Sequence, residues 1–182
     1  MQTTGIVRRI DDLGRVVIPK EIRKTLRIRE GDPLEIYTNK EELVFKKFSP
    51  MASLKANAKL VCEELSRFCN RDCFILDTDG VICVSNSKYK DIIGVIMSDE
   101  MSKILNNRRN YIISSTEDGK SIKIYKGDEN EYENQMVIPI LSNGDLFGGV
   151  VLFDKQRDKR FNSLDEKMVM FGASLLSSQF EL

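Results

Sequence analysis

The chain has 182 residues, of which 41% are hydrophobic and 31% are charged, so it can form one globular domain or two small ones and is too apolar to be disordered. It has no net charge and no histidine, which excludes Ser-His-Asp and Cys-His arrangements and most zinc and iron sites. No apolar run approaches the roughly 18 residues of a membrane span, so we expect a cytoplasmic protein without a membrane partner.

The zero net charge hides a basic and an acidic part of the chain. Residues 1–50 contain 11 basic and 8 acidic residues, a net charge of +3, whereas residues 51–182 contain 17 and 20, a net charge of −3. This asymmetry predicts two domains, 1–50 and 51–182, of which the first binds a polyanion.

The first predicted elements are two short strands joined by a turn. Residues 5–10 and 15–18 are rich in β-branched side chains, and the Asp-Asp-Leu-Gly run between them is typical of a turn in which Gly14 adopts a positive φ. A helix follows over residues 19–26, because a proline fits the first helical position.

This helix is predicted to have one cationic face. Its basic residues recur at i, i+3, i+4 and i+7, while Ile22 and Leu26 fall on the opposite side. Arginines of the two strands add to the charge, and a rigid surface this basic indicates double-stranded DNA as the partner. The predicted DNA-binding residues are Arg8, Arg9, Arg15, Lys20, Arg23, Lys24 and Arg27.

Two more strands, residues 34–37 and 43–47, are predicted to form a hairpin and to complete a β-β-α-β-β unit. A unit this small buries little core alone, and dimerisation is a usual remedy. We therefore expect a second copy of the chain to complete the sheet and to double the cationic surface.

Four runs in residues 1–50 resemble the AbrB-type transition-state regulator DNA-binding domain. They are residues 4–8, 13–19, 21–26 and 31–36. The resemblance implies a swapped-hairpin β-barrel dimer, in which the strands of two chains interleave. The residues that it implies on the DNA face are Arg8, Arg15, Arg23 and Lys24. A lysine at position 24 keeps the charge but lacks the planar fork of an arginine.

The second domain is predicted to begin and end with a helix, over residues 52–69 and 164–180. In both, spacings of three and four separate the apolar positions. Two interpretations stay open: each helix packs on the sheet of its own domain, or the pair also bundles with the pair of a second copy. The predicted positions are Leu54, Ala58, Val61, Leu65 and Phe68, and then Leu164, Met168, Phe171, Leu175 and Ser178.

Between these helices we expect five strands and one helix. Turn sequences at residues 77–80 and 142–145 indicate hairpins, and Ser98 is placed as the N-cap of a helix that ends near Leu105. The predicted strands are residues 74–76, 81–84, 121–125, 136–141 and 147–153. The order predicts an α+β fold, an antiparallel sheet between helices in an α/β/α sandwich.

This arrangement resembles a GAF domain, a small-molecule sensor fold. The resemblance is in residues 76–80, in Pro139 and Ile140 before the turn, and in residues 148–153. It implies a small-molecule effector that no motif identifies, and we expect no cofactor, metal or catalytic residue. Both domains together are similar to a family of regulators of genes in the developing spore, which implies a homotetramer of two swapped dimers joined through the helices of the GAF-like domains.

Two other functions stay open. Swapped-hairpin domains also occur in antitoxins, which bind operator DNA and a toxin but usually end in a disordered tail. Some GAF proteins are reductases that use paired cysteines, and this chain has Cys62, Cys69, Cys73 and Cys83. Their spacing matches no zinc motif, and buried inert thiols are the simpler interpretation, so we predict that the protein is not an enzyme.

Overall fold

The computed structural model describes residues 5–28, 30–114, 119–156 and 160–180. Thr4, which is part of the AbrB-type resemblance, lies outside these residues. The chain folds into two compact units, which we call the head (residues 1–48) and the body (residues 49–182). Ser49 belongs to the body, because its hydroxyl donates to the carboxylate of Asp77 at 3.2 Å. The assignment of functions to residues 1–50 and 51–182 stays a prediction.

The helix of the head, α1 (Lys20–Leu26), begins directly after Pro19. This proline has φ −57° and ψ 148°, so it is the N-cap residue and not the first helical residue that we predicted. The helix ends at Leu26. Its C-cap residue, Arg27, has a left-handed conformation, and the backbone N–H of Arg27 donates to the carbonyl groups of Arg23 and Lys24. Basic residues in this last turn also interact favourably with the partial negative charge of the terminal carbonyls.

Two strands of the head, β1 (Leu34–Asn39) and β2 (Glu42–Lys47), form the predicted antiparallel hairpin. The end of the hairpin is tied to the end of α1 by Lys47. Its Nζ lies 3.2 Å from a carboxylate oxygen of Asp32 and 3.5 Å from the carbonyl oxygen of Arg27. The hairpin and the helix are therefore held together by polar contacts more than by a core.

Residues 5–18 form the predicted turn but not the predicted strands. The carboxylate of Asp11 accepts the backbone N–H groups of Leu13 and Arg15, and Gly14 has φ 75°. In the part of the chain that the structure describes, neither residues 5–10 nor residues 15–18 form a strand. A strand requires a neighbour, and one copy of the chain supplies no ladder for these segments.

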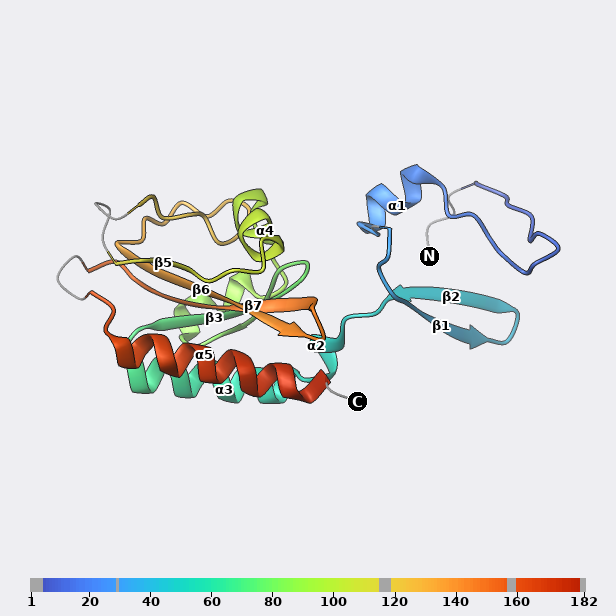
Figure 1. Cartoon of the computed structure of the whole chain (residues 1–182). Helices are drawn as coiled ribbons and strands as arrows, with labels where there is room; N and C mark the ends of the chain where they lie inside the picture. Colours follow the sequence, from blue (N-terminus) through green and yellow to red (C-terminus); the bar gives the residue numbers. More distant parts are fainter. Residues whose placement is uncertain (1–4, 29, 115–118, 157–159, 181–182) are drawn as a thin grey trace. The chain divides into compact units, whose positions relative to one another are not determined.

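The body is a five-stranded antiparallel sheet with helices on both faces, so the predicted α+β sandwich is confirmed (Figure 1). Its strand order is β4-β3-β7-β6-β5. The strands are β3 (Asp72–Asp77), β4 (Val81–Val84), β5 (Tyr111–Ile113), β6 (Asn134–Ser142) and β7 (Asp145–Asp154). Most residues of the three central strands are buried, as expected for a sheet covered on both faces.

Two helices, α3 (Lys55–Cys69) and α5 (Ser163–Ser177), lie side by side on one face of the sheet, and α4 (Asp99–Asn106) covers the other face (Figure 1). Ser98 caps α4 as predicted, because its Oγ accepts the backbone N–H of Met101 at 2.9 Å. The shorter elements are α2 (Pro50–Ser53) and the 3-10 helices η1 (Ser87–Ile92) and η2 (Ser178–Phe180).

The predicted first helix of the body is divided at Leu54, which separates α2 from α3. Pro50 is the first residue of α2, and Ser49 is the N-cap residue, although its side chain forms no capping hydrogen bond. Met51 is fully buried in the core between the sheet and the helices α3 and α5. The start of the body is therefore fixed by packing directly after residue 48.

The predicted strand at residues 121–125 is wrong, and β5 takes its place as the fifth strand. The backbone of Ile122 is instead paired with a side chain: its N–H donates to Oε1 of Gln135 and its carbonyl accepts from Nε2, both at 2.9 Å. The N–H of Ile124 likewise donates to the carboxylate of Asp128 at 2.8 Å. Side chains thus satisfy this backbone where the apolar alternation indicated a sheet neighbour.

Candidate nucleic-acid interface

The helix α1 brings four of the seven predicted DNA-binding residues to one side of the head. Lys20, Arg23, Lys24 and Arg27 follow one another at helical spacing. Within the described residues none of the four forms an ion pair with a carboxylate. The Nε of Arg23 is shielded from solvent and has no hydrogen-bond partner in that part of the chain. The positive charge of this face is therefore not neutralised by carboxylates within the described residues, although one donor of Arg23 is shielded.

The other three predicted residues, Arg8, Arg9 and Arg15, are exposed and lie in residues 5–18. The Nε of Arg15 lies 2.7 Å from a carboxylate oxygen of Asp11, with side chains 69% and 36% exposed. A pair this exposed is screened by water and contributes little to stability. The backbone N–H of Arg15, and then its guanidinium, hold the pKa of Asp11 below its usual value.

The position of these three arginines relative to α1 depends on how residues 5–18 pair. The helix sets the spacing of its own four cations, whereas no strand holds Arg8, Arg9 and Arg15 within one copy of the chain. The assignment of all seven residues to a DNA-binding surface thus stays a prediction.

The head exposes apolar side chains together with its cations. None of the side chains in residues 5–28 and 30–48 is buried. Twelve large apolar residues are between 38% and 88% exposed. They are Ile6, Val7, Ile10, Leu13, Val16, Val17, Leu26, Ile36, Tyr37, Leu43, Phe45 and Phe48. Exposed apolar surface on this scale marks an interaction site, and it shows that one copy of the head lacks a core.

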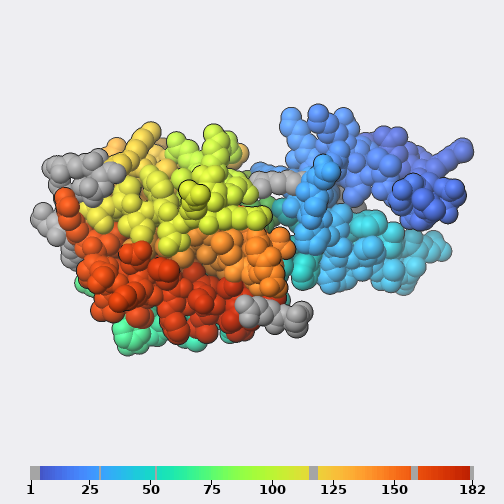
Figure 2. Space-filling view, in the orientation of Figure 1, coloured from blue at the N-terminus to red at the C-terminus, as the bar shows by residue number. Residues whose placement is uncertain are grey.

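In the body, the apolar stripe of α5 points away from the core. Leu164, Phe171 and Leu175 are 65%, 63% and 44% exposed, whereas residues such as Val169 and Leu176 pack on the sheet. The helix runs along the surface of the body in the space-filling view, where it is coloured red (Figure 2). Three of the five predicted positions therefore lie on the outer side of α5, whereas Met168 packs against the core and Ser178 lies in η2.

The stripe predicted for α3 is used mainly within the body. Ala58, Val61 and Leu65 are buried in the core, which supports the simpler of the two interpretations for this helix. Two apolar side chains of α3, Leu60 and Phe68, are nevertheless 59% and 63% exposed. Both helices thus present apolar side chains to solvent in a single copy of the chain.

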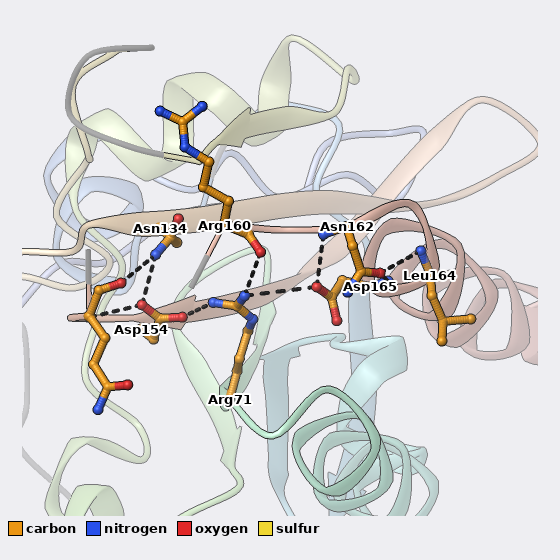
Figure 3. A network of polar contacts seen from close by, with 8 residues as sticks. Arg71, Asn134, Asp154, Arg160, Asn162, Leu164 and Asp165 are labelled. Atoms are coloured by element: carbon orange, nitrogen blue, oxygen red, sulfur yellow. Dashed lines mark hydrogen bonds and ion pairs between the residues drawn. The ribbon is translucent and has the colours of Figure 1, made fainter. Parts of the chain in front are cut away.

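A buried polar network holds the start of α5 in place (Figure 3). The guanidinium of Arg71 pairs with Asp154, at the end of β7, and lies 3.8 Å from Asp165 in the first turn of α5. It also donates to the carbonyl oxygen of Arg160 at 3.0 Å. The side chain of Asn162 accepts the N–H of Asp165, whose carboxylate accepts the N–H of Asn162, a reciprocal helix cap. No local sequence pattern indicated this network, because its residues come from separate elements.

The four cysteines are free thiols with raised pKa values where a shift is resolved. Burial raises the pKa of Cys69 and of Cys83 to about 11. A hydrogen bond with Cys62, and then burial, raise the pKa of Cys73 well above its usual value. Thiols that stay protonated at neutral pH are weak nucleophiles, so this geometry favours a packing role.

The described residues offer neither a metal-ligating cluster nor a membrane-spanning helix. No cluster of three or more metal-ligating side chains occurs among them. Over the same residues, each helix is too short or too polar to cross a membrane.

Comparisons with known proteins agree with both units. A family model described as "Stage V sporulation protein T C-terminal, transcription factor" matches residues 53–181, and one described as "Antidote-toxin recognition MazE, bacterial antitoxin" matches residues 7–47. The GAF domain of an Acinetobacter phosphoenolpyruvate-protein phosphotransferase is similar in structure, with a TM-score of 0.58 and 13% identity over 69% of this chain and 80% of that chain. The body therefore has the GAF fold.

These findings define a class of transcription factor in which an AbrB-like N-terminal domain precedes a GAF-fold domain. The transition state regulatory protein AbrB of Bacillus subtilis (strain 168) is 46% identical over 65 residues, 36% of this chain and 68% of AbrB. Stage V sporulation protein T of the same organism is 42% identical over 182 residues, 100% of this chain and 99% of the relative. The chain belongs to the stage V sporulation protein T family, and the resemblance predicted from the sequence is confirmed.

Proposed function

We propose that the protein is a DNA-binding regulator of sporulation genes in the forespore, working in the cytoplasm as an assembly of several copies. The observation that carries this proposal is the composition of the head surface. Twelve exposed apolar side chains accompany seven predicted DNA-binding cations, and no described side chain of the head is buried. The apolar residues fit a second copy, and the cations fit a polyanion.

In the proposed assembly, residues 5–10 and 15–18 of two chains pair with each other and with both hairpins as a swapped-hairpin β-barrel. The exchange gives the β-branched segments the strand neighbours that one chain does not provide. It also buries side chains such as Val17 and Phe45, which are 73% and 38% exposed in a single copy. A two-fold dimer then presents both cationic helices symmetrically.

The cations of this dimer are proposed to bind mainly phosphate groups. Arginine donors suit phosphate oxygens, and such contacts supply affinity without reading bases, which favours relaxed sequence preference. The contribution of Arg15 is compatible with its pair to Asp11, since that pair uses one of five N–H donors. Lys24 is expected to contribute charge but little sequence discrimination.

The body is proposed to set the geometry of a tetramer and to sense a small molecule. The exposed side chains of α5 and α3 fit the helices of a second body, which would join two swapped dimers. An effector can act only if it binds one arrangement of the bodies better than another, and it would then change which spacing of DNA sites the heads bridge.

Salt dependence of duplex binding by the full chain tests the central part of this proposal. A dimer with ~6–10 phosphate contacts should lose a factor of ~10³–10⁵ in affinity between ~50 and ~200 mM salt. Fluorescence anisotropy with a labelled duplex measures this slope. A change of less than about tenfold over that range would contradict phosphate binding by the seven cations.

An antitoxin function is the second candidate, because the match of residues 7–47 to the MazE family model favours it. In that case a small basic protein, the toxin, would co-purify with the chain. The transcription-factor family match to residues 53–181 supports the regulator instead. Mass spectrometry of the freshly isolated protein distinguishes the two functions.

A further inference from the structure

The face of the sheet under α4 is filled by the protein's own side chains. Phe153 packs edge to face against Phe74 and Tyr132, with ring centroids 4.7 and 4.8 Å away, and all three rings are buried. Leu105 of α4 rests directly on the sheet at Gly149, where a Cβ atom would lie 2.5 Å from its methyl carbon. A ligand on this face would have to displace core side chains, which costs several kcal/mol.

A groove of about 500 Å³ lies elsewhere in the body, between α3, the edge strand β4 and η1. This volume is within the range of sites that bind small molecules. Its apolar lining includes Ile82 and Ile93, and its rim has three lysines, Lys55 and Lys59 on α3 and Lys90 on η1. The groove therefore combines an apolar surface with a cationic rim.

The positive charge of this rim is largely uncompensated. Lys59 faces Glu63 at 3.7 Å, in a pair whose side chains are 67% and 49% exposed. Over the residues that the structure describes, Lys55 and Lys90 form no ion pair. Three ammonium groups thus stand around one carboxylate, and lysines suit anions of varied geometry because they act as flexible point charges.

A hydroxyl group adds a directional donor to the groove. The Oγ of Ser85, a lining residue, accepts the backbone N–H of Cys73 at 2.9 Å. Its own proton remains available to a ligand oxygen. Apolar surface, flexible cations and a neutral donor in one groove fit an amphipathic anion better than a neutral or cationic ligand.

We propose that this groove binds a small organic anion, with a carboxylate or phosphate group at the lysines and a short apolar chain against Ile82 and Ile93. Such a ligand would connect α3 to η1 across the edge of the sheet. The proposal names a site and a ligand class for the proposed sensing role of the body. Binding of the anion does not depend on that role, but any effect of the anion on DNA binding rests on it.

The test is a titration of the full chain labelled at isoleucine methyl groups, followed by NMR. The probes are hexanoate, hexyl phosphate and the uncharged hexanamide. We expect saturable shifts at Ile82 and Ile93 with at least one anion, and none at Ile138, which is buried in the central sheet. Hexanamide should bind at least about tenfold more weakly than the anion that binds. Comparison of hexanoate with hexyl phosphate shows whether the groove prefers a carboxylate or a phosphate group.

A double variant, Lys55→Gln with Lys90→Gln, should weaken binding of the anion by about fivefold for each lysine removed. Lys103→Gln, an exposed lysine on α4 outside the groove, is the matched control and should bind the anion normally. Unchanged shifts at Ile138 show that the double variant is folded. Equal affinity for hexanamide and hexanoate, normal binding by the double variant, or shifts that spare Ile82 and Ile93 would each overturn the proposal.

Duplex affinity measured on the same samples separates this proposal from the proposed function. Anion binding without any change in duplex affinity supports the groove and contradicts the sensing role. Failure of every anion to bind, with duplex affinity intact, overturns the groove and leaves the DNA-binding regulator in place.

Discussion

The head and the body of this chain differ in where their apolar side chains lie. The body buries two clusters, one on each face of its sheet, and residues such as Ile75 and Phe74 are fully buried. The head buries none of its described side chains. At about 1.5–3 kcal/mol for each large apolar side chain removed from water, the body gains burial energy as one chain, whereas the described head gains little unless the proposed second copy covers it.

The two units also differ in how they treat charge. In the body, Arg71 is enclosed by Asp154 and Asp165, an arrangement that satisfies a buried cation. In the head, the four cations of α1 are left without carboxylate partners among the described residues. A buried charge with partners is structural, and a group of accessible cations without partners is suited to an external anion.

The largest effect is expected from Val17→Asp, which replaces an exposed apolar side chain of the head by a charged one and tests whether two heads share a core. If two heads share a core, the variant should lose dimerisation of the heads and, with it, duplex affinity on the order of 10³-fold, because each head then binds alone. Size-exclusion chromatography and anisotropy measure the two losses. The body should melt at the normal temperature, and Lys103→Asp on α4 should change neither property. An intact dimer would contradict a shared core.

Arg15→Ala and Arg23→Ala should remove the function of the head and leave its fold intact. Each variant takes two cations from a dimer, and we expect no measurable duplex binding at ~0.15 M salt. The melting temperature should change by no more than about 3 °C, because the pair of Arg15 with Asp11 is exposed and the half-buried Arg23 has no ion pair to lose among the described residues. Arg109→Ala in the body is the matched control and should bind normally. Unfolding of either head variant would make these arginines structural.

Arg71→Ala should destabilise the body by about 3–5 kcal/mol, because it leaves the buried carboxylate of Asp165 and the largely buried one of Asp154 without their cation. Urea denaturation measures this loss. Arg67→Ala is the matched control: Arg67 pairs with Glu64, but the two side chains are 67% and 43% exposed, so about 1 kcal/mol or less is expected. Equal losses in the two variants would contradict the buried role of Arg71.

Phe171→Ser should divide the proposed tetramer into dimers while each body stays folded. The ring is 63% exposed in one copy, so its removal leaves no cavity, but it takes about 1.5–3 kcal/mol of apolar burial from each chain in the assembly. Native mass spectrometry gives the number of copies. Lys167→Ser on the same helix should leave the assembly unchanged, and a tetramer that tolerates Phe171→Ser would place the contact elsewhere.

The smallest effect is expected from acid. The pKa of Asp11 is lowered by the backbone N–H and then by the guanidinium of Arg15, so the carboxylate stabilises the turn above its ordinary pKa. That contribution is lost as the pH falls through the lowered value. An NMR titration should give a midpoint below 3.8, and Arg15→Ala should raise it without restoring the ordinary value. A midpoint at or above 3.8 would contradict these contacts.

Features with a local cause could be predicted from the sequence. The turn around Gly14, the cap at Ser98 and the hairpin of β1 and β2 follow from a few neighbouring residues, and so does the cationic face of α1. The strand expected at residues 121–125 was wrong because Gln135, on another element, pairs with that backbone. Alternation of apolar residues indicates burial but not what supplies the hydrogen bonds.

Features that combine distant parts of the chain could not be predicted. Arg71 and its two carboxylates come from separate elements, and no local pattern relates them. Lys55 and Lys90 line one groove because β4 lies between their elements. The outward stripe of α5 was recognised by its spacing, but which side faces the sheet depends on packing, since Val169 and Leu176 form a second apolar row.

The most direct test of the central claim is an isotope-filtered NMR experiment on a mixture of ¹⁵N-labelled and ¹³C-labelled full chains. If two heads interleave, cross-peaks should connect residues 5–18 of one chain with residues 34–47 of the other, and they should persist when duplex is added. Contacts confined to one chain, or a head without ordered structure in the intact protein, would contradict the account.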